Sequence, residues 1–132
     1  MGGVLANHPF NHLTSAILKS AIEVHRHLGP GLLESAYCAC LAYELTAAGL
    51  AVQAGIKVPL VYKGVQIDCS YVLDLVVNDT VIIELKSVSQ IAWIHKAQLL
   101  TYLRLTGCPA GLLINFIVPV LKDGVSRVLN TP

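Results

Sequence analysis

Asp74, Glu84 and Lys86 are the first candidates for chemistry in this sequence, because two acids and a base lie on two apolar segments joined by Asn78-Asp79. The large apolar residues of both segments fall on odd numbers, so burying them on one face fixes an antiparallel register centred on Asp79. This register predicts that Asp74 lies opposite Glu84, with Cβ atoms about 5 Å apart, and that Lys86 shares their face.

Two carboxylates at this spacing repel each other, by roughly 4 kcal/mol at about 4 Å and an effective dielectric of about 20. A positive charge must therefore accompany Asp74 and Glu84. Lys86 supplies part of it, and two converging carboxylates with a backbone carbonyl nearby also form an oxygen-rich site for a divalent cation. The alternative is an ordinary cross-strand salt bridge at a wet sheet edge.

The elements that must position these residues follow from hydrophobic periodicity and from the glycines, prolines and Asn-Asp pairs between them. Three- and four-residue spacing predicts helices, and two-residue spacing predicts an antiparallel meander. The predicted helices are 13–28, 31–48 and 91–106, and the predicted strands are 51–62, 65–77, 80–86 and 110–117, with a last hairpin ending at 126–129. This order predicts an α+β fold with a mixed sheet flanked by helices.

A chain of 132 residues predicts one domain, with residues 1–12 as an N-terminal arm and residues 118–132 as a C-terminal hairpin or tail. Hydrophobic residues make up 55% of the chain and charged residues 13%, which excludes disorder. The longest apolar run is too short and too interrupted to span a membrane. The N-terminus does not resemble a signal peptide, so we expect a cytoplasmic protein. The apolar excess predicts a homo-oligomer, with a dimer favoured.

The net charge of +1 excludes a protein that coats nucleic acid through a strong overall field, so any phosphate site must be local. Cys38 and Cys40 are two apart in a predicted helix and point in different directions, so they cannot chelate one ion. Cys69 and Cys108 stand alone in the sequence. The four cysteines therefore predict reduced, mostly buried thiols.

Asp74 followed by Glu84-Leu85-Lys86 resembles the metal-binding signature of the PD-(D/E)XK nuclease superfamily, although Leu73 stands where that signature has proline. The predicted element order also resembles the αβββαβ core of that superfamily. The resemblance implies a restriction-endonuclease-like fold and a nuclease activity.

Other segments extend the resemblance over residues 13–128. The segment from Gly31 to Tyr37 resembles the G-x-x-E-x-x-Y signature of a family of small bacterial proteins. Gln98 and Tyr102 resemble the Q-x-x-x-Y motif of RecB-like nucleases, and residues 111–116 continue the similarity. Each motif is short, and their order along the chain makes the resemblance specific.

The resemblance implies that Asp74, Glu84 and the carbonyl of Leu85 bind Mg²⁺ or Mn²⁺, and that Lys86 orients the attacking water and neutralises phosphoryl charge. It implies that Glu34 is a further catalytic residue and metal ligand, directly or through water. A glutamate in a first helical turn is also a routine partner of the helix dipole, which is the alternative for Glu34.

Substrate contacts are implied for Gln98 and Tyr102, which share a helix face, for His95 on the same face, and for Tyr37. The alternative for Gln98 and Tyr102 is a half-buried helix face with two polar tips. Tyr37 is equally compatible with a core aromatic whose hydroxyl is hydrogen-bonded. The spacing does not place His25 at the site.

These residues favour a Mg²⁺-dependent nuclease that hydrolyses phosphodiester bonds of nucleic acid, with DNA preferred as the expected substrate. The alternative is a non-catalytic oligomerising or protein-binding module on a nuclease-like fold. Hydrolysis of a small phosphoester also stays open. The sequence leaves open DNA versus RNA, endo versus exo action and sequence preference.

Overall fold

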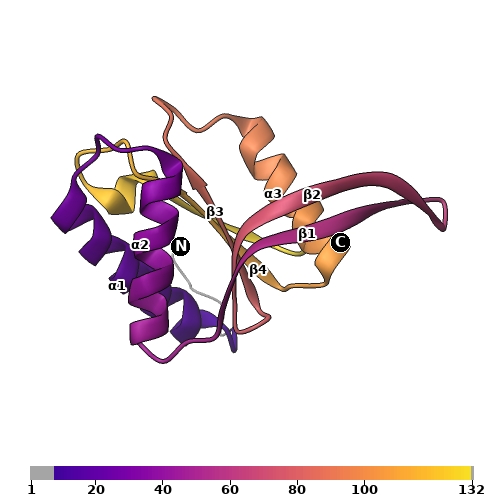
Figure 1. Cartoon of the computed structure of the whole chain (residues 1–132), viewed down its shortest axis with the longest axis horizontal. Helices are drawn as coiled ribbons and strands as arrows, with labels where there is room; N and C mark the ends of the chain where they lie inside the picture. The colour runs from indigo at the N-terminus through magenta and orange to yellow at the C-terminus, as the bar shows by residue number, and fades with distance from the viewer. Residues whose placement is uncertain (1–7, 132) are drawn as a thin grey trace.

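Two layers of helix enclose a twisted sheet in the computed structural model, which describes residues 8–131 apart from the side chain of Cys69 (Figure 1). Helices α1 (Asn11–Leu28) and α2 (Glu34–Ala47) pack on one face, and α3 (Trp93–Thr106) covers the other. The expectation about a signal peptide falls largely on residues 1–7, outside the described residues. No helix among residues 8–131 is long and apolar enough to cross a bilayer.

The sheet has five strands in sequential order. They are β1 (Val52–Tyr62), β2 (Val65–Val77), β3 (Val81–Lys86), β4 (Ala110–Asn115) and β5 (Val125–Leu129). The β3 and β4 strands are parallel and are joined through α3, whereas the other neighbouring strands are antiparallel. The predicted α+β fold with an αβββαβ core and a mixed sheet is confirmed.

Alternation along the central strands divides the apolar residues between two cores. Odd-numbered residues such as Leu75 and Ile83 join the core under α1 and α2, together with Tyr37 and Phe116. Ile82 points to the opposite face and joins the core under α3. Because β3 and β4 are buried on both faces, the carboxylate and ammonium groups of β3 are confined to its C-terminal end.

The hairpin between β2 and β3 has the predicted register, since Val77 pairs with Val81 and Leu75 pairs with Ile83. Asn78 and Asp79 both have positive φ, as a tight turn between twisted strands requires. The next positions along the two strands are Asp74 and Glu84. The odd-numbered pattern therefore predicted correctly which residues face each other across this hairpin.

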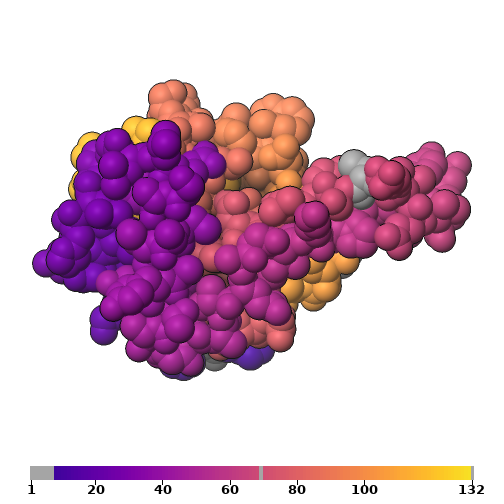
Figure 2. Space-filling model, viewed as in Figure 1, coloured from indigo at the N-terminus to yellow at the C-terminus, as the bar shows by residue number. Residues whose placement is uncertain are grey.

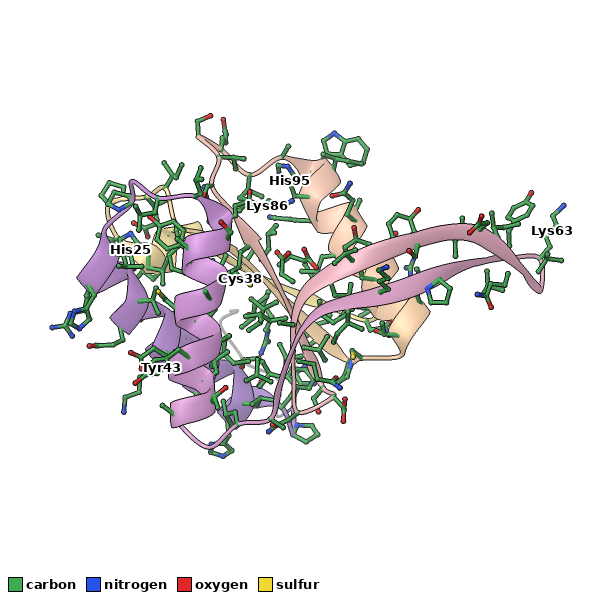
Figure 3. The ribbon with its side chains drawn as sticks, in the orientation of Figure 1. His25, Cys38, Tyr43, Lys63, Lys86 and His95 are labelled. Carbon is green, nitrogen blue, oxygen red and sulfur yellow. The ribbon has the colours of Figure 1, made fainter. Side chains whose placement is uncertain are left out.

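Beyond Asp74, β2 separates from β3 and continues only with β1, so residues 56–73 form a two-stranded ribbon. Its base packs in the core under α3, and its far end projects from the body (Figures 1 and 2). We call this ribbon the arm. Its tip is a turn at Lys63 and Gly64, both with positive φ. Lys63 stands at the far end of the molecule from α1 and α2 (Figure 3).

Several element boundaries differ from the prediction because tertiary contacts hold the connecting residues extended. Helix α2 begins at Glu34 and not at Gly31, since Leu33 is extended and Leu32 is hydrogen-bonded to Tyr37 and Ser87. Helix α3 begins two residues later than predicted, after an extended Ala92.

The two chain ends also differ from the prediction. Helix α1 begins at Asn11, two residues earlier than predicted, so the last two residues of the predicted N-terminal arm belong to this helix. The predicted C-terminal hairpin or tail contains β5, which is the edge strand of the main sheet and pairs with β4 along its full length. A 3₁₀ turn, Leu121–Gly124, precedes β5.

Candidate functional site

Asp74 is hydrogen-bonded to Glu84 and to Leu85 at the point where β2 leaves β3. The backbone N–H of Asp74 donates to Glu84 Oε1 at 3.3 Å, and the backbone N–H of Leu85 donates to Asp74 Oδ2 at 2.8 Å. Each carboxylate thus accepts a backbone N–H of the opposite strand. The predicted pairing of these two acids is therefore present in the structure.

The environment of Glu84 disfavours two negative charges at this point. Glu84 is buried, with a relative exposure of 8%. Burial first and the Asp74 charge second raise the pKa of Glu84 to about 8, while the nearby Lys86 ammonium lowers it. At neutral pH the pair therefore holds a proton, which an added cation would replace.

Lys86, the last residue of β3, lies between α2 and α3 in the view of Figure 3. Its neighbour in the parallel ladder is Asn115 of β4, which is buried. The side chain of Asn115 accepts from the N–H of Val88 at 3.2 Å and donates to the carbonyl of Val88 at 2.8 Å. Asn115 therefore fixes the chain directly after Lys86.

Glu34, in the first turn of α2, accepts a hydrogen bond from the backbone N–H of Ser87 at 3.1 Å. The Ser87 hydroxyl donates to the carbonyl of Leu32 at 3.3 Å. These two bonds attach the start of α2 to the residue that follows Lys86. Glu34 thus lies near the site. Its position in the first turn of α2 is also compatible with the alternative role, an interaction with the helix dipole.

A cavity of about 340 Å³ lies between α2, β1 and β2. Glu34 and Asp74 both line it, so the structure brings these two predicted residues to one space beneath α2. The other lining residues are Ser35, Cys38, Ala54, Gly55, Val72 and Leu73. The cavity is open to solvent at exposed residues such as Glu34 and Gly55.

Cys38 lies in this cavity, one helical turn after Glu34 on the same face of α2 (Figure 3). Burial raises the pKa of its thiol, and the charges of Asp74 and Glu84 raise it further. The thiol therefore stays protonated beside the two acids. The sequence predicts Cys38 only as a reduced thiol. The spacing of four from Glu34 was the available signal that it faces the same cavity.

Tyr102 of α3 is half-buried, and its ring lies 5.5 Å from the ring of Tyr71 on β2. Burial raises the pKa of Tyr102, as do the charges of Glu84, Tyr71 and Asp74. Tyr102 is thus close enough to the acids to sense their charge. Gln98 is exposed one turn earlier on the same helix face.

His95 has a defined local role, because its Nδ1 accepts the N–H of Ala92 at 3.0 Å and caps α3. This bond leaves Nε2 as the protonated nitrogen of the neutral ring. His25 lies elsewhere: its Nε2 is 2.8 Å from the carbonyl of Val118, in the loop after β4. His25 therefore connects α1 to that loop and is not among the residues of the cavity.

Tyr37 is fully buried and stacks on Phe116 with ring centroids 4.2 Å apart. Its hydroxyl donates to the carbonyl of Gly29 and accepts the N–H of Leu32 at 3.0 Å. Tyr37 thus has the hydrogen-bonded core position that is the alternative to a substrate contact. It holds the Gly29–Leu32 connection that leads into α2.

Replacing Tyr37 with Phe should lower the free energy of unfolding by about 1–3 kcal/mol, because the carbonyl of Gly29 and the N–H of Leu32 both lose their partner in part-buried hydrogen bonds. Chemical denaturation of the two proteins measures this difference. Tyr43→Phe is the matched control, since Tyr43 lies on the same helix and is 73% exposed. Equal stability of Tyr37→Phe and the original protein would contradict the role.

Comparison with known protein families matches residues 11–128 to the PD-(D/E)XK nuclease superfamily. The chain belongs to this superfamily. No curated protein and no solved structure matched significantly. The match spans every helix and strand of the described fold, except for the last residue of β5.

PD-(D/E)XK nucleases generally use divalent metal ions, and the donor set of this site fits such an ion. Hard oxygen ligands converge from Asp74 and Glu84, and a proton now offsets their repulsion. Within residues 8–131, no group of three or more His, Cys, Asp and Glu side chains is arranged to hold a metal. The metal roles of Asp74, Glu84, Glu34 and the Leu85 carbonyl stay predictions.

Proposed function

We propose that this PD-(D/E)XK protein is a divalent-metal-dependent nuclease that hydrolyses DNA, with Mg²⁺ or Mn²⁺ as its cofactor. The observation that carries the proposal is the Asp74–Glu84 pair, which stands at the open end of the β2–β3 ladder beside Lys86. A site with only a structural role at the edge of the sheet would not require Asp74, Glu84 and Lys86 together.

Asp74, Glu84 and the carbonyl of Leu85 would hold the ion, with Glu34 as a further ligand through water. When bound, a divalent cation supplies a more acidic water and polarises a phosphate oxygen. Lys86 would orient the attacking water and offset the charge that develops on the phosphoryl oxygens. The protonated Cys38 thiol adds no charge to the site.

Gln98, Tyr102 and His95 would contact the substrate from α3. The protonated Nε2 of His95 can donate to a phosphate oxygen, and the Tyr71–Tyr102 pair offers an aromatic surface beside the acids. Tyr37 would act indirectly, through the connection that carries Glu34. With a net charge of +1, binding relies on these local contacts and a few cations, which predicts weak and salt-sensitive association.

We further infer membership of the G-x-x-E-x-x-Y group and a RecB-like motif set within the superfamily. Support for the first comes from the linked roles of its residues, since Glu34 binds Ser87 and Tyr37 binds Gly29 and Leu32. We also propose a cytoplasmic location, with which the free Cys38, Cys40 and Cys108 are compatible.

Incubation with single-stranded DNA, duplex DNA and RNA, each with Mg²⁺ or Mn²⁺, tests the proposed activity. Cleavage by the original protein should disappear on metal chelation and in Glu84→Ala. Cleavage that survives Glu84→Ala and Lys86→Ala alike would come from a contaminant. If no substrate is cleaved, the alternative function of a non-catalytic binding module is favoured.

We propose that the protein forms a homo-oligomer, with a dimer favoured, and that the arm takes part in its interface. Antiparallel pairing places Leu60, Tyr62, Val65 and Ile67 on one face of the ribbon. Tyr62 and Val65 are each 59% exposed, and a two-stranded ribbon alone is marginally stable. An apolar face of this kind gains stability when a partner covers it.

Replacing both Val65 and Ile67 with Lys should convert the oligomer to a monomer of 14.1 kDa, because charges would be buried in the interface. Light scattering at micromolar concentration measures the mass. Val61→Lys is the control, since Val61 is 52% exposed on the opposite face of the arm. If the protein without substitutions is already a monomer, the proposal of a homo-oligomer is wrong.

A further inference from the structure

Gly55 has a backbone conformation that is unusual inside a strand. It lies in the fourth position of β1 and has a φ of +62°. The register of β1 and β2 brings Gly55 opposite Asp74, yet the ladder pairs only the residues on either side, namely Ala54 with Leu75 and Ile56 with Leu73. The β1–β2 ladder is therefore interrupted at the position of Asp74.

The positive φ, and not a lack of space, explains why glycine stands at position 55. A Cβ atom built on Gly55 would meet no heavy atom within 4 Å. Left-handed backbone is readily adopted by glycine, is tolerated by asparagine, and is disfavoured for alanine and more so for β-branched residues.

The alternation of side chains along β2 is broken at the same point. In a regular strand Leu73 and Leu75 would face the same side. Leu73 instead packs in the core under α3, whereas Leu75 packs in the core under α1 and α2. This reversal occurs at Asp74, between the two leucines. The positive φ of Gly55 and the broken alternation at Asp74 thus occur at positions that lie opposite each other, and together they form one irregularity.

This irregularity directs Asp74 toward β3. Its N–H donates to Glu84 Oε1, and its Oδ2 accepts from the N–H of Leu85 at 2.8 Å. Gly55 and Asp74 also line the same cavity. The left-handed conformation of Gly55 therefore occurs next to Asp74, whose carboxylate belongs to the proposed metal site.

We propose that Gly55 is a positioning residue, whose left-handed conformation interrupts the β1–β2 ladder so that Asp74 pairs with Glu84 and Leu85. One consequence is that metal affinity depends on the backbone conformation at position 55, and this consequence rests on the proposed function. Gly55 itself supplies no ligand atom.

Three variants separate backbone conformation from bulk, namely Gly55→Asn, Gly55→Ala and Gly55→Val. If conformation matters, Asn should come closest to the original protein although it is larger than Ala. If filling the cavity matters, Ala should come closest. Gly64→Ala is the matched control, because Gly64 at the arm tip has a φ of +76° and open space around its Cβ position.

Two readouts are measured on the full chain, the dissociation constant for Mn²⁺ by calorimetry and the hydrogen-exchange protection of the Leu85 amide without metal. Gly55→Asn should keep Mn²⁺ affinity within about threefold and keep Leu85 protection. Gly55→Ala should weaken Mn²⁺ binding at least tenfold and lower Leu85 protection relative to Ile82, and Gly55→Val should do so more strongly. Gly64→Ala should change neither.

The positioning role is overturned if Asn is worse than Ala, if all three variants match the original protein, or if Gly64→Ala has the effect of Gly55→Ala. Failure of the original protein to bind Mn²⁺ would instead overturn the proposed function. In that case the order of Leu85 protection, which needs no metal, still decides whether Gly55 positions Asp74.

Discussion

Lys86→Ala should lower the rate of metal-dependent cleavage by about 100- to 1,000-fold, the effect of removing one donor that stabilises developing charge in a transition state. Its ammonium lies close enough to Glu84 to lower the pKa of that carboxyl. Because Lys86 supplies no metal ligand, the affinity for Mn²⁺ should change far less than the rate. Single-turnover cleavage and calorimetry measure the two quantities separately.

Lys19→Ala is the control for this prediction, because Lys19 is an exposed residue of α1 and does not line the cavity that contains Asp74. It removes one positive charge without altering the site. Equal losses of rate in both variants would reduce the role of Lys86 to general attraction of a polyanion. An unchanged rate in Lys86→Ala would remove Lys86 from the proposed chemistry.

Glu84→Gln should abolish metal binding and, in the metal-free protein, raise the stability at alkaline pH. The folded-state pKa of Glu84 is about 8, well above the ordinary value of 4.5. Between these values the folded protein binds more protons than the unfolded chain, so stability falls as pH rises through this window. Glutamine keeps an acceptor for the N–H of Asp74 and cannot ionise.

Each pKa unit corresponds to about 1.4 kcal/mol of stability. Between the two pKa values of Glu84 the folded protein therefore loses a few kcal/mol of stability, or on the order of ten degrees in Tm. Thermal unfolding with chelator at pH 5 and at pH 8.5 measures it. The gain in Tm of Glu84→Gln over the original protein should be larger at pH 8.5. Asp74→Asn removes one cause of the raised pKa and should show a weaker pH dependence. The same gain at both pH values would contradict the account.

Much of the site geometry could be predicted because strand periodicity is a strict rule. The odd-numbered apolar residues of β2 and β3 fix which residues pair, and the observed register follows that prediction. Helical spacing likewise placed Tyr102 on the same face of α3 as Gln98. In both cases, residues near in sequence determine the geometry.

What could not be predicted depends on contacts between distant segments. Helix α2 begins later than predicted because Leu32 donates its N–H to Tyr37 and its carbonyl accepts from Ser87, and residue 87 lies far along the chain from residue 32. Asn115 fixes Val88 through its side chain, and no local pattern indicates that bond. Gly55 has an ordinary place in a strand pattern, and only its φ distinguishes it.

Location of the metal tests the central claim most directly, namely that Asp74 and Glu84 form one cation site beside Lys86. A crystal soaked in Mn²⁺ should show an anomalous peak between the two carboxylates, within coordination distance of an oxygen from each. The same soak of Glu84→Gln should show no peak there. A peak only elsewhere, or no ion between the two carboxylates at saturating Mn²⁺, would contradict the account.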